Sequence, residues 1–166
     1  MNEITVETKE RLEQQMIEQF CDVTCNFDLA VTLTFTRAPT GPEAVERDFR
    51  HFMNRLNRAT YGNDWREKAE QCADQRIAVI PIHEDGYGRK QLHYHCVFST
   101  PEHLSIEKFS KMILFIWSEL RIGSKKYNEI KKIYDREGWI DYIMKEVNLL
   151  IPDNNNKIDA LNMHTY

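Results

Sequence analysis

The sequence predicts an α+β fold in which four strands and two helices follow one another in the order β-α-β-β-α-β. Residues 29–36 and 92–99 alternate apolar and other side chains, which is the period of a strand with one buried face. Residues 42–62 and 106–120 repeat their apolar side chains at helical spacing. Glycines and an aspartate within 84–90 indicate a hairpin connection. We therefore expect an antiparallel sheet with both helices on one face.

The first strand and the first helix are predicted within residues 29–62. The strand carries large apolar residues at its odd positions and alanine or threonine at its even positions, so its second face should be polar. Gly41 and Pro42 then open the helix, because proline is tolerated at the first helical position. The helix is expected to end near Gly62. Its apolar stripe consists of Val45, Phe49, Phe52, Met53 and Leu56.

The second and third strands are expected at 77–82 and 92–99. Pro81 lacks an amide donor, which suggests an edge or irregular position in the sheet. In the third strand, alternation sends the apolar set under the helices, namely Leu92, Tyr94, Cys96 and Phe98. It leaves His93 and His95 on the opposite, polar face of the sheet, together with the threonines of the first strand.

The remaining elements complete a ferredoxin-like, RRM-like order. Ser105 is expected to cap a second helix whose apolar face is formed by Ile106, Phe109, Ile113, Ile116 and Leu120. A short strand is expected at 128–134. A third helix should run from about Asp135 or Gly138 to Leu150, where Pro152 follows.

Length and composition fit one globular domain. Of the 166 residues, 42% are hydrophobic and 29% are charged, and the formal net charge is −4. This charge argues against a protein that coats long stretches of nucleic acid. No apolar run could span a bilayer and the N-terminus does not look like a secretion signal, so we expect a cytoplasmic protein without a membrane partner. We expect an N-terminal helical extension at 1–25, the domain at 26–151 and a poorly ordered tail at 152–166.

His93 and His95 stand two residues apart, so they lie on the same side of a strand, about 7 Å apart, and can converge on one ion. Alone, this pattern is more typical of ordinary hydrogen-bonded histidines. We expect the third ligand to be His83, at the end of the neighbouring strand. Glu84 is the alternative, although alternation sends it to the other face unless the strand has ended. Imidazoles with a carboxylate suit Mn²⁺ or Mg²⁺ acting on a phosphate, and do not exclude zinc.

Tyr142, Lys145 and Glu146 fall together on one face of the predicted third helix, away from its apolar stripe. A surface tyrosine with a lysine one turn away is common and needs no function. The functional interpretation is a phenol that attacks phosphorus and an ammonium that positions charge. Because a tyrosine hydroxyl is a poor nucleophile at neutral pH, its target must be polarised, and a metal held by the histidines would do that.

These motifs together resemble those of the HUH endonucleases. They are most similar to the rolling-circle replication initiator (Rep) proteins of plasmids, phages and small single-stranded DNA viruses. The similar stretches occur in the family's order: a first-strand motif around 33–35, IHEDG at 82–86, HYH at 93–95 and YIMK at 142–145. The likeness covers roughly residues 28–150.

The resemblance implies an activity, a cofactor and partners. His93 and His95 would bind the divalent cation, Tyr142 would attack the scissile phosphate of single-stranded DNA, and Lys145 would assist. Attack would leave a 5′-phosphotyrosine link and a free 3′-hydroxyl that can later rejoin strands. The DNA would be a replication origin, which can include a stem-loop. A host helicase and polymerase are implied as well, because the sequence contains no phosphate-binding GxxxxGK[ST] motif.

The sequence departs from the Rep pattern at the third ligand and the tyrosines. Viral Rep proteins often carry a glutamate ligand where Pro81 stands here, and proline cannot coordinate. His83 is our substitute, and Glu84 and Glu146 are less favoured contributors. No second tyrosine lies one helical turn from Tyr142, so a single nucleophile is implied.

Basic residues expected to contact the DNA are Arg47, Arg50, Arg89, Lys90, Lys125 and Lys126. Two other functions stay open. One is a one-tyrosine HUH transposase or a relaxase, which shares the chemistry but acts on other DNA. The other is a non-catalytic single-strand nucleic-acid-binding module, since RNA-recognition domains have the same element order. Such a module should expose stacking aromatics on the sheet face, where this sequence offers threonines and histidines.

Overall fold

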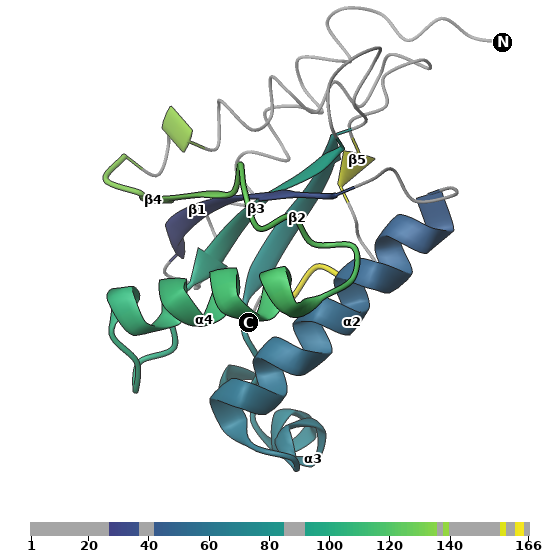
Figure 1. Ribbon diagram of the computed structural model, residues 1–166. Coiled ribbons are helices and arrows are strands. Elements are labelled where there is room, and N and C mark those ends of the chain that lie inside the picture. The colour runs from purple at the N-terminus through teal and green to yellow at the C-terminus, as the bar shows by residue number, and fades with distance from the viewer. Residues whose placement is uncertain are drawn as a thin grey trace, which may run out of the picture.

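The computed structural model contains a five-stranded antiparallel sheet with its two long helices on one face (Figure 1). The structure describes residues 27–36, 42–84, 92–135, 138–139, 157–158 and 162–164. The strands are β1 (Phe27–Thr34), β2 (Val79–Glu84), β3 (His93–Ser99), β4 (Glu129–Lys132) and β5 (Lys157–Ile158). The helices are α2 (Pro42–Tyr61), α3 (Trp65–Gln71), α4 (Ile106–Glu119) and a 3₁₀ turn, Ala73–Gln75.

The order of strands across the sheet is β4-β1-β3-β2-β5, and every neighbouring pair is antiparallel. The first four strands and the helices α2 and α4 confirm the predicted α+β class and the β-α-β-β-α-β order. None of the helices in the described part of the chain is long and apolar enough to cross a membrane.

The larger hydrophobic core lies between the sheet and the helices α2 and α4. It contains the predicted apolar residues of β1 and of β3, together with the stripes of the two helices. The helix α2 begins at Pro42 and ends before Gly62, whose φ of +95° suits glycine. Ser105 caps α4 as predicted, because its hydroxyl oxygen accepts a hydrogen bond from the Lys108 amide.

The opposite face of the sheet is divided into a polar half and an apolar half. The polar half carries Thr32, Thr34, His93 and His95, as the alternation of β1 and β3 predicted. The apolar half is a second, smaller core formed by Phe27, Ala78, Ile80, Ile82 and Val97, with Ile133, Trp139 and Met163 packed against it. The prediction of a polar second face was therefore wrong for this half.

The C-terminal segment and the stretch before β2 differ from the prediction. Lys157–Ile158 pairs with β2, and His164 exchanges two backbone hydrogen bonds with Val79, of 2.8 and 2.9 Å. The prediction of a poorly ordered tail was wrong for these residues. The helix α3 and the 3₁₀ turn were not predicted at all. The expected extension at 1–25, most of the hairpin connection and nearly all of the third helix lie outside the described residues.

The end of β1 is fixed by four hydrogen bonds on Thr34. Its carbonyl oxygen accepts from Trp117 Nε1 and from the Ser124 amide, both at 2.9 Å. Its amide donates to Asn128 Oδ1 at 2.9 Å, and its hydroxyl donates to the Tyr127 carbonyl oxygen at 2.7 Å. Because Thr34 pairs directly with His93, these bonds also fix the strand against which the histidines lie.

Gly123 should be required for this arrangement. A Cβ atom added there would lie 1.9 Å from the Trp117 carbonyl oxygen, and two backbones cannot shift cheaply to relieve it. We expect Gly123→Ala to lower the free energy of unfolding by about 1–3 kcal/mol, as overpacking does. Urea denaturation measures the effect. Ser118→Ala, next to Trp117 but on the outer side of α4, is the control and should change stability by less than about 0.5 kcal/mol. Equal midpoints for the two variants would contradict the expectation.

Candidate metal centre

Three potential metal ligands meet at the start of β3 and the end of β2. One ligand atom each of Glu84, His93 and His95 lies within 4.8 Å of the others. In the pairing of β2 with β3, Glu84 is directly opposite His93, and Ile82 is directly opposite His95. Directly opposed residues of an antiparallel pair lie on the same side of the sheet, so this register collects all three side chains on the face away from the helices.

Glu84 is the centre of the group. Its Oε2 atom lies 2.7 Å from His95 Nε2 and 3.8 Å from His93 Nε2. The two imidazole rings are 5.7 Å apart between centroids. Between 16% and 25% of each side chain is exposed, so the group is partly buried but still reachable from solvent.

The structure places Glu84, and not the preferred His83, beside the histidine pair. His83 is directly opposite Tyr94 and is buried on the helix side of the sheet, with 5.6 Å between the two ring centroids. The strand β2 extends through Glu84, two residues beyond the predicted end, and its alternation continues to that point. Because a shift of one residue exchanges the two faces of a strand, our placement of His83 on the histidine face was wrong.

The donor set fits a divalent cation. Metal–ligand bonds of about 2.1 Å limit two donors on one ion to a separation of roughly 4.2 Å. The two distances from the Glu84 oxygen to the histidine nitrogens already satisfy that limit. Two neutral imidazoles and one carboxylate suit Mn²⁺ and other first-row ions, and Mg²⁺ less well because it prefers oxygen ligands.

Thr32 is a second contact of the group that the sequence analysis did not identify. Its hydroxyl oxygen lies 3.2 Å from His95 Nδ1, and Thr32 is directly opposite His95 in the pairing of β1 with β3. If Nε2 binds a cation, Nδ1 carries the ring proton and donates it to Thr32. A threonine in this place therefore selects the tautomer that can act as a ligand. Alternation had put Thr32 on the right face, but only the register puts it opposite His95.

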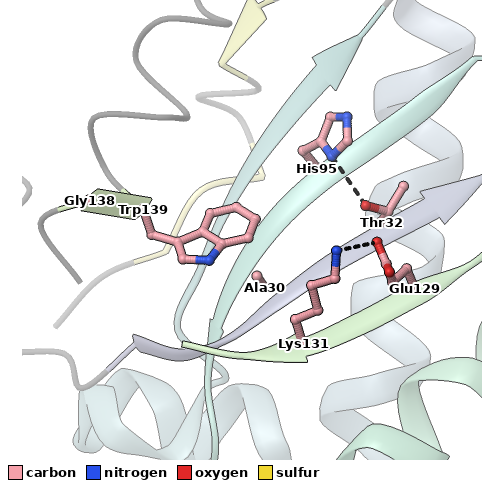
Figure 2. A pocket seen from close by; sticks show the side chains of 7 residues that line it. All are labelled: Ala30, Thr32, His95, Glu129, Lys131, Gly138 and Trp139. Carbon is pink, nitrogen blue, oxygen red and sulfur yellow. Dashed lines mark hydrogen bonds and ion pairs between the residues drawn. The ribbon is translucent and has the colours of Figure 1, made fainter. Parts of the chain in front are cut away.

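A cavity of about 370 Å³ opens beside the histidines on the same face. Figure 2 shows His95 and Thr32 at one end and the Trp139 ring at the other, with Lys131 and Glu129 on β4 between them. Lys131 Nζ and Glu129 Oε2 form an ion pair of 3.0 Å. Trp139 belongs to the start of the third predicted helix, since residues 138 and 139 are helical and both amides donate to Asp135.

The other predicted site residues are not all brought to this face. Lys125 and Lys126 are exposed in the loop before β4, whose Tyr127 carbonyl oxygen binds Thr34 at the histidine end of β1. Arg47 is exposed on α2, and Arg50 lines a different cavity. The remaining predictions fall outside the described residues, namely Arg89, Lys90, Tyr142, Lys145 and Glu146.

The family model for the replication-associated protein ORF2 matches residues 28–148, which is more than half of the chain. The chain belongs to this family. The match supports a replication initiator and includes the metal group and the sequence positions of Tyr142 and Lys145. No curated protein and no solved structure matches the chain significantly.

Glu84 should contribute more to cation binding in this member of the replication-associated protein family than any other carboxylate of its sheet. Glu84→Gln keeps the shape of the side chain but removes its charge, so we expect Mn²⁺ affinity to fall by at least about tenfold. Isothermal titration of the full chain with Mn²⁺ measures this. Glu129→Gln is the matched control, because Glu129 lies on the same face but outside the group. An equal loss in both variants would show that the cation binds elsewhere.

Thr32 should act through His95 and not by contact with the cation. Thr32→Val keeps the shape and removes the acceptor of the Nδ1 proton, and loss of such an outer contact typically weakens metal binding about 10–100-fold. Titration with Mn²⁺ again gives the measurement. The control is Thr60→Val, whose hydroxyl donates only within α2, to the Leu56 carbonyl oxygen. Unchanged affinity in Thr32→Val would mean that His95 is oriented by another contact.

Proposed function

We propose that this protein nicks and joins single-stranded DNA at a replication origin and thereby initiates rolling-circle replication. The observation that carries the proposal is the convergence of Glu84, His93 and His95 on one sheet face in a member of a replication-associated family. Residues that meet from two strands with two nitrogen donors and one oxygen donor are suited to bind a cation. Such a cation is what a phosphate-directed nucleophile of low reactivity requires.

The metal group would hold Mn²⁺ or Mg²⁺. A bound cation supplies Lewis-acid polarisation of the scissile phosphate and a template that orients it. His95 would bind through Nε2 and keep its proton on Nδ1, toward Thr32. Glu84 would bind with its charge partly offsetting that of the cation. Since the three side chains remain partly exposed, a phosphate can approach from the open side of the sheet.

Tyr142 would be the nucleophile. Its phenolic oxygen forms a bond to phosphorus while the bond from phosphorus to the 3′-oxygen breaks. The phenol loses its proton and the departing 3′-oxygen gains one, which leaves a 5′-phosphotyrosine and a 3′-hydroxyl. One phosphodiester replaces another, so the 3′-hydroxyl can attack in reverse and join strands. Lys145, one helical turn later in the predicted helix, would stabilise charge on the phosphate.

The cavity beside His95 supports this assignment. Trp139 lines it, and Tyr142 follows Trp139 by three residues in the sequence. Lys131 from β4 lines it as well and provides a cation for the DNA backbone. With about 370 Å³, the cavity is large enough for part of a nucleotide next to the metal group.

Two alternatives predict different results. A one-tyrosine transposase or a relaxase would use the same residues on other DNA, so only substrate choice separates it from an initiator. A non-catalytic binding module has no need of the Glu84, His93 and His95 group, and the described sheet face presents it where stacking aromatics would be expected. A host helicase and polymerase would complete replication in the first case.

The tyrosine assignment is tested with a covalent adduct. The full chain is incubated with Mn²⁺ and a pool of single-stranded oligonucleotides that includes origin-like stem-loops, and adducts are separated in denaturing gels. We expect the unmodified protein to form an adduct, EDTA to abolish it, and Tyr142→Phe to reduce it at least about a thousandfold, as loss of a nucleophile does.

Tyr134→Phe is the matched control, because Tyr134 is 88% exposed and lies eight residues upstream. It should form the adduct at the normal rate. An adduct that persists in Tyr142→Phe would overturn the nucleophile, and binding without any adduct would favour the non-catalytic module.

A further inference from the structure

A second cavity, of about 410 Å³, lies between α2, α3 and residues 162–164, away from the metal group. Three arginines line it, and each comes from a different part of the chain: Arg50 from α2, Arg66 from α3 and Arg76 from the segment before β2. His164 lines it too, and Glu70 is its one carboxylate among the described residues. A chain with a formal charge of −4 thus gathers three cations around one cavity.

The arginines are held in place by neighbouring residues. Arg66 lies over the buried Trp65 ring, with 5.1 Å from the guanidinium carbon to the ring centroid. Arg50 Nε donates to Asn162 Oδ1 at 3.4 Å, and the buried Asn162 in turn donates to the Glu46 carbonyl oxygen at 3.0 Å. These contacts use aromatic faces and neutral amides, so they orient the guanidinium groups without neutralising them.

Arg76 is the most buried of the three. It is partly buried, and no carboxylate among the residues the structure describes forms an ion pair with it. Burial lowers the pKa of Arg76, although an arginine stays charged at neutral pH. The pKa of His164 is lowered as well, first because of its own burial and second because Arg76 repels the charged imidazole. Positive charge here is therefore concentrated and incompletely compensated.

We propose that this cavity binds a phosphate group, carried by a nucleic-acid backbone or by a free nucleotide. A phosphate has three or more acceptor oxygens and can receive forked hydrogen bonds from several guanidinium groups at once, whereas one arginine already satisfies a carboxylate. The cavity is also larger than a phosphate needs, so it has room for the attached nucleoside.

The position of the cavity separates it from the proposed cleavage chemistry. His164 is bridged to Val79 at the start of β2, whereas Glu84 ends that strand. Five residues at roughly 3.3 Å each put about 17 Å between these two points. A phosphate bound here is thus not the phosphate beside the metal group.

The experiment measures binding of inorganic phosphate, dAMP and a labelled 20-nucleotide single strand to the full chain in EDTA at constant ionic strength. EDTA removes any cation from the metal group, so the result does not depend on whether the protein nicks DNA. Arg76→Gln and Arg66→Gln should each weaken inorganic phosphate binding by at least about tenfold, the expected loss for a hydrogen bond to a charged group. Arg66 is exposed, so its variant keeps the test valid if Arg76→Gln does not fold.

Arg58→Gln is the matched control, because Arg58 is exposed on α2 and does not line the cavity. Its phosphate binding should be normal. If the same two variants weaken the oligonucleotide and reduce the slope of its salt dependence by about one, the phosphate belongs to a nucleic-acid backbone. If they weaken dAMP and leave the oligonucleotide unchanged, it belongs to a free nucleotide. Normal binding of all three ligands in both variants would overturn the proposal.

Discussion

The candidate metal centre depends on the register between β2 and β3. Glu84 and His93 are directly opposed, and this single pairing brings a carboxylate to two imidazoles. A slip of one residue would put His83 on that face and turn Glu84 toward the helices. Such a slip would also move Tyr94 and Phe98, both fully buried, out of the larger core. The packing of the helix side therefore fixes the register, and the register in turn assembles the metal group on the other side.

The elements of the fold could be predicted from the sequence because their signals are local. Pro42, Gly62 and Ser105 define helix ends through their own backbone chemistry, and alternation alone put His93 and His95 opposite the helices. Contacts between distant strands could not be predicted in this way. Glu84 falls within the stretch that looked like a hairpin connection, and its pairing partner is determined by the register of the sheet. The contact of Thr32 with His95 joins residues 63 positions apart for the same reason.

The division of the open sheet face gives the metal group its environment. On one side of it lie Ile82 and the smaller core, where Trp139 is packed against the strands. On the other side lie the threonines of β1. A group at this boundary is shielded from water in one direction, which strengthens its electrostatic interactions, and open in the other, where a strand of DNA can approach. The partial exposure of Glu84, His93 and His95 is consistent with both requirements.

The distribution of charge limits how this protein can meet nucleic acid. A net charge of −4 repels a polyanion over most of the surface, so attraction must come from places where cations are concentrated. The metal group and the arginine cavity are two such places, and β2 connects them, with Glu84 at its end and the Val79–His164 bridge at its start. Because a paired strand is stiff, the separation between the two is set by the fold and not by the ligand. A nucleic acid that touches both must therefore span a fixed distance, and its affinity should depend on few phosphates and only moderately on salt.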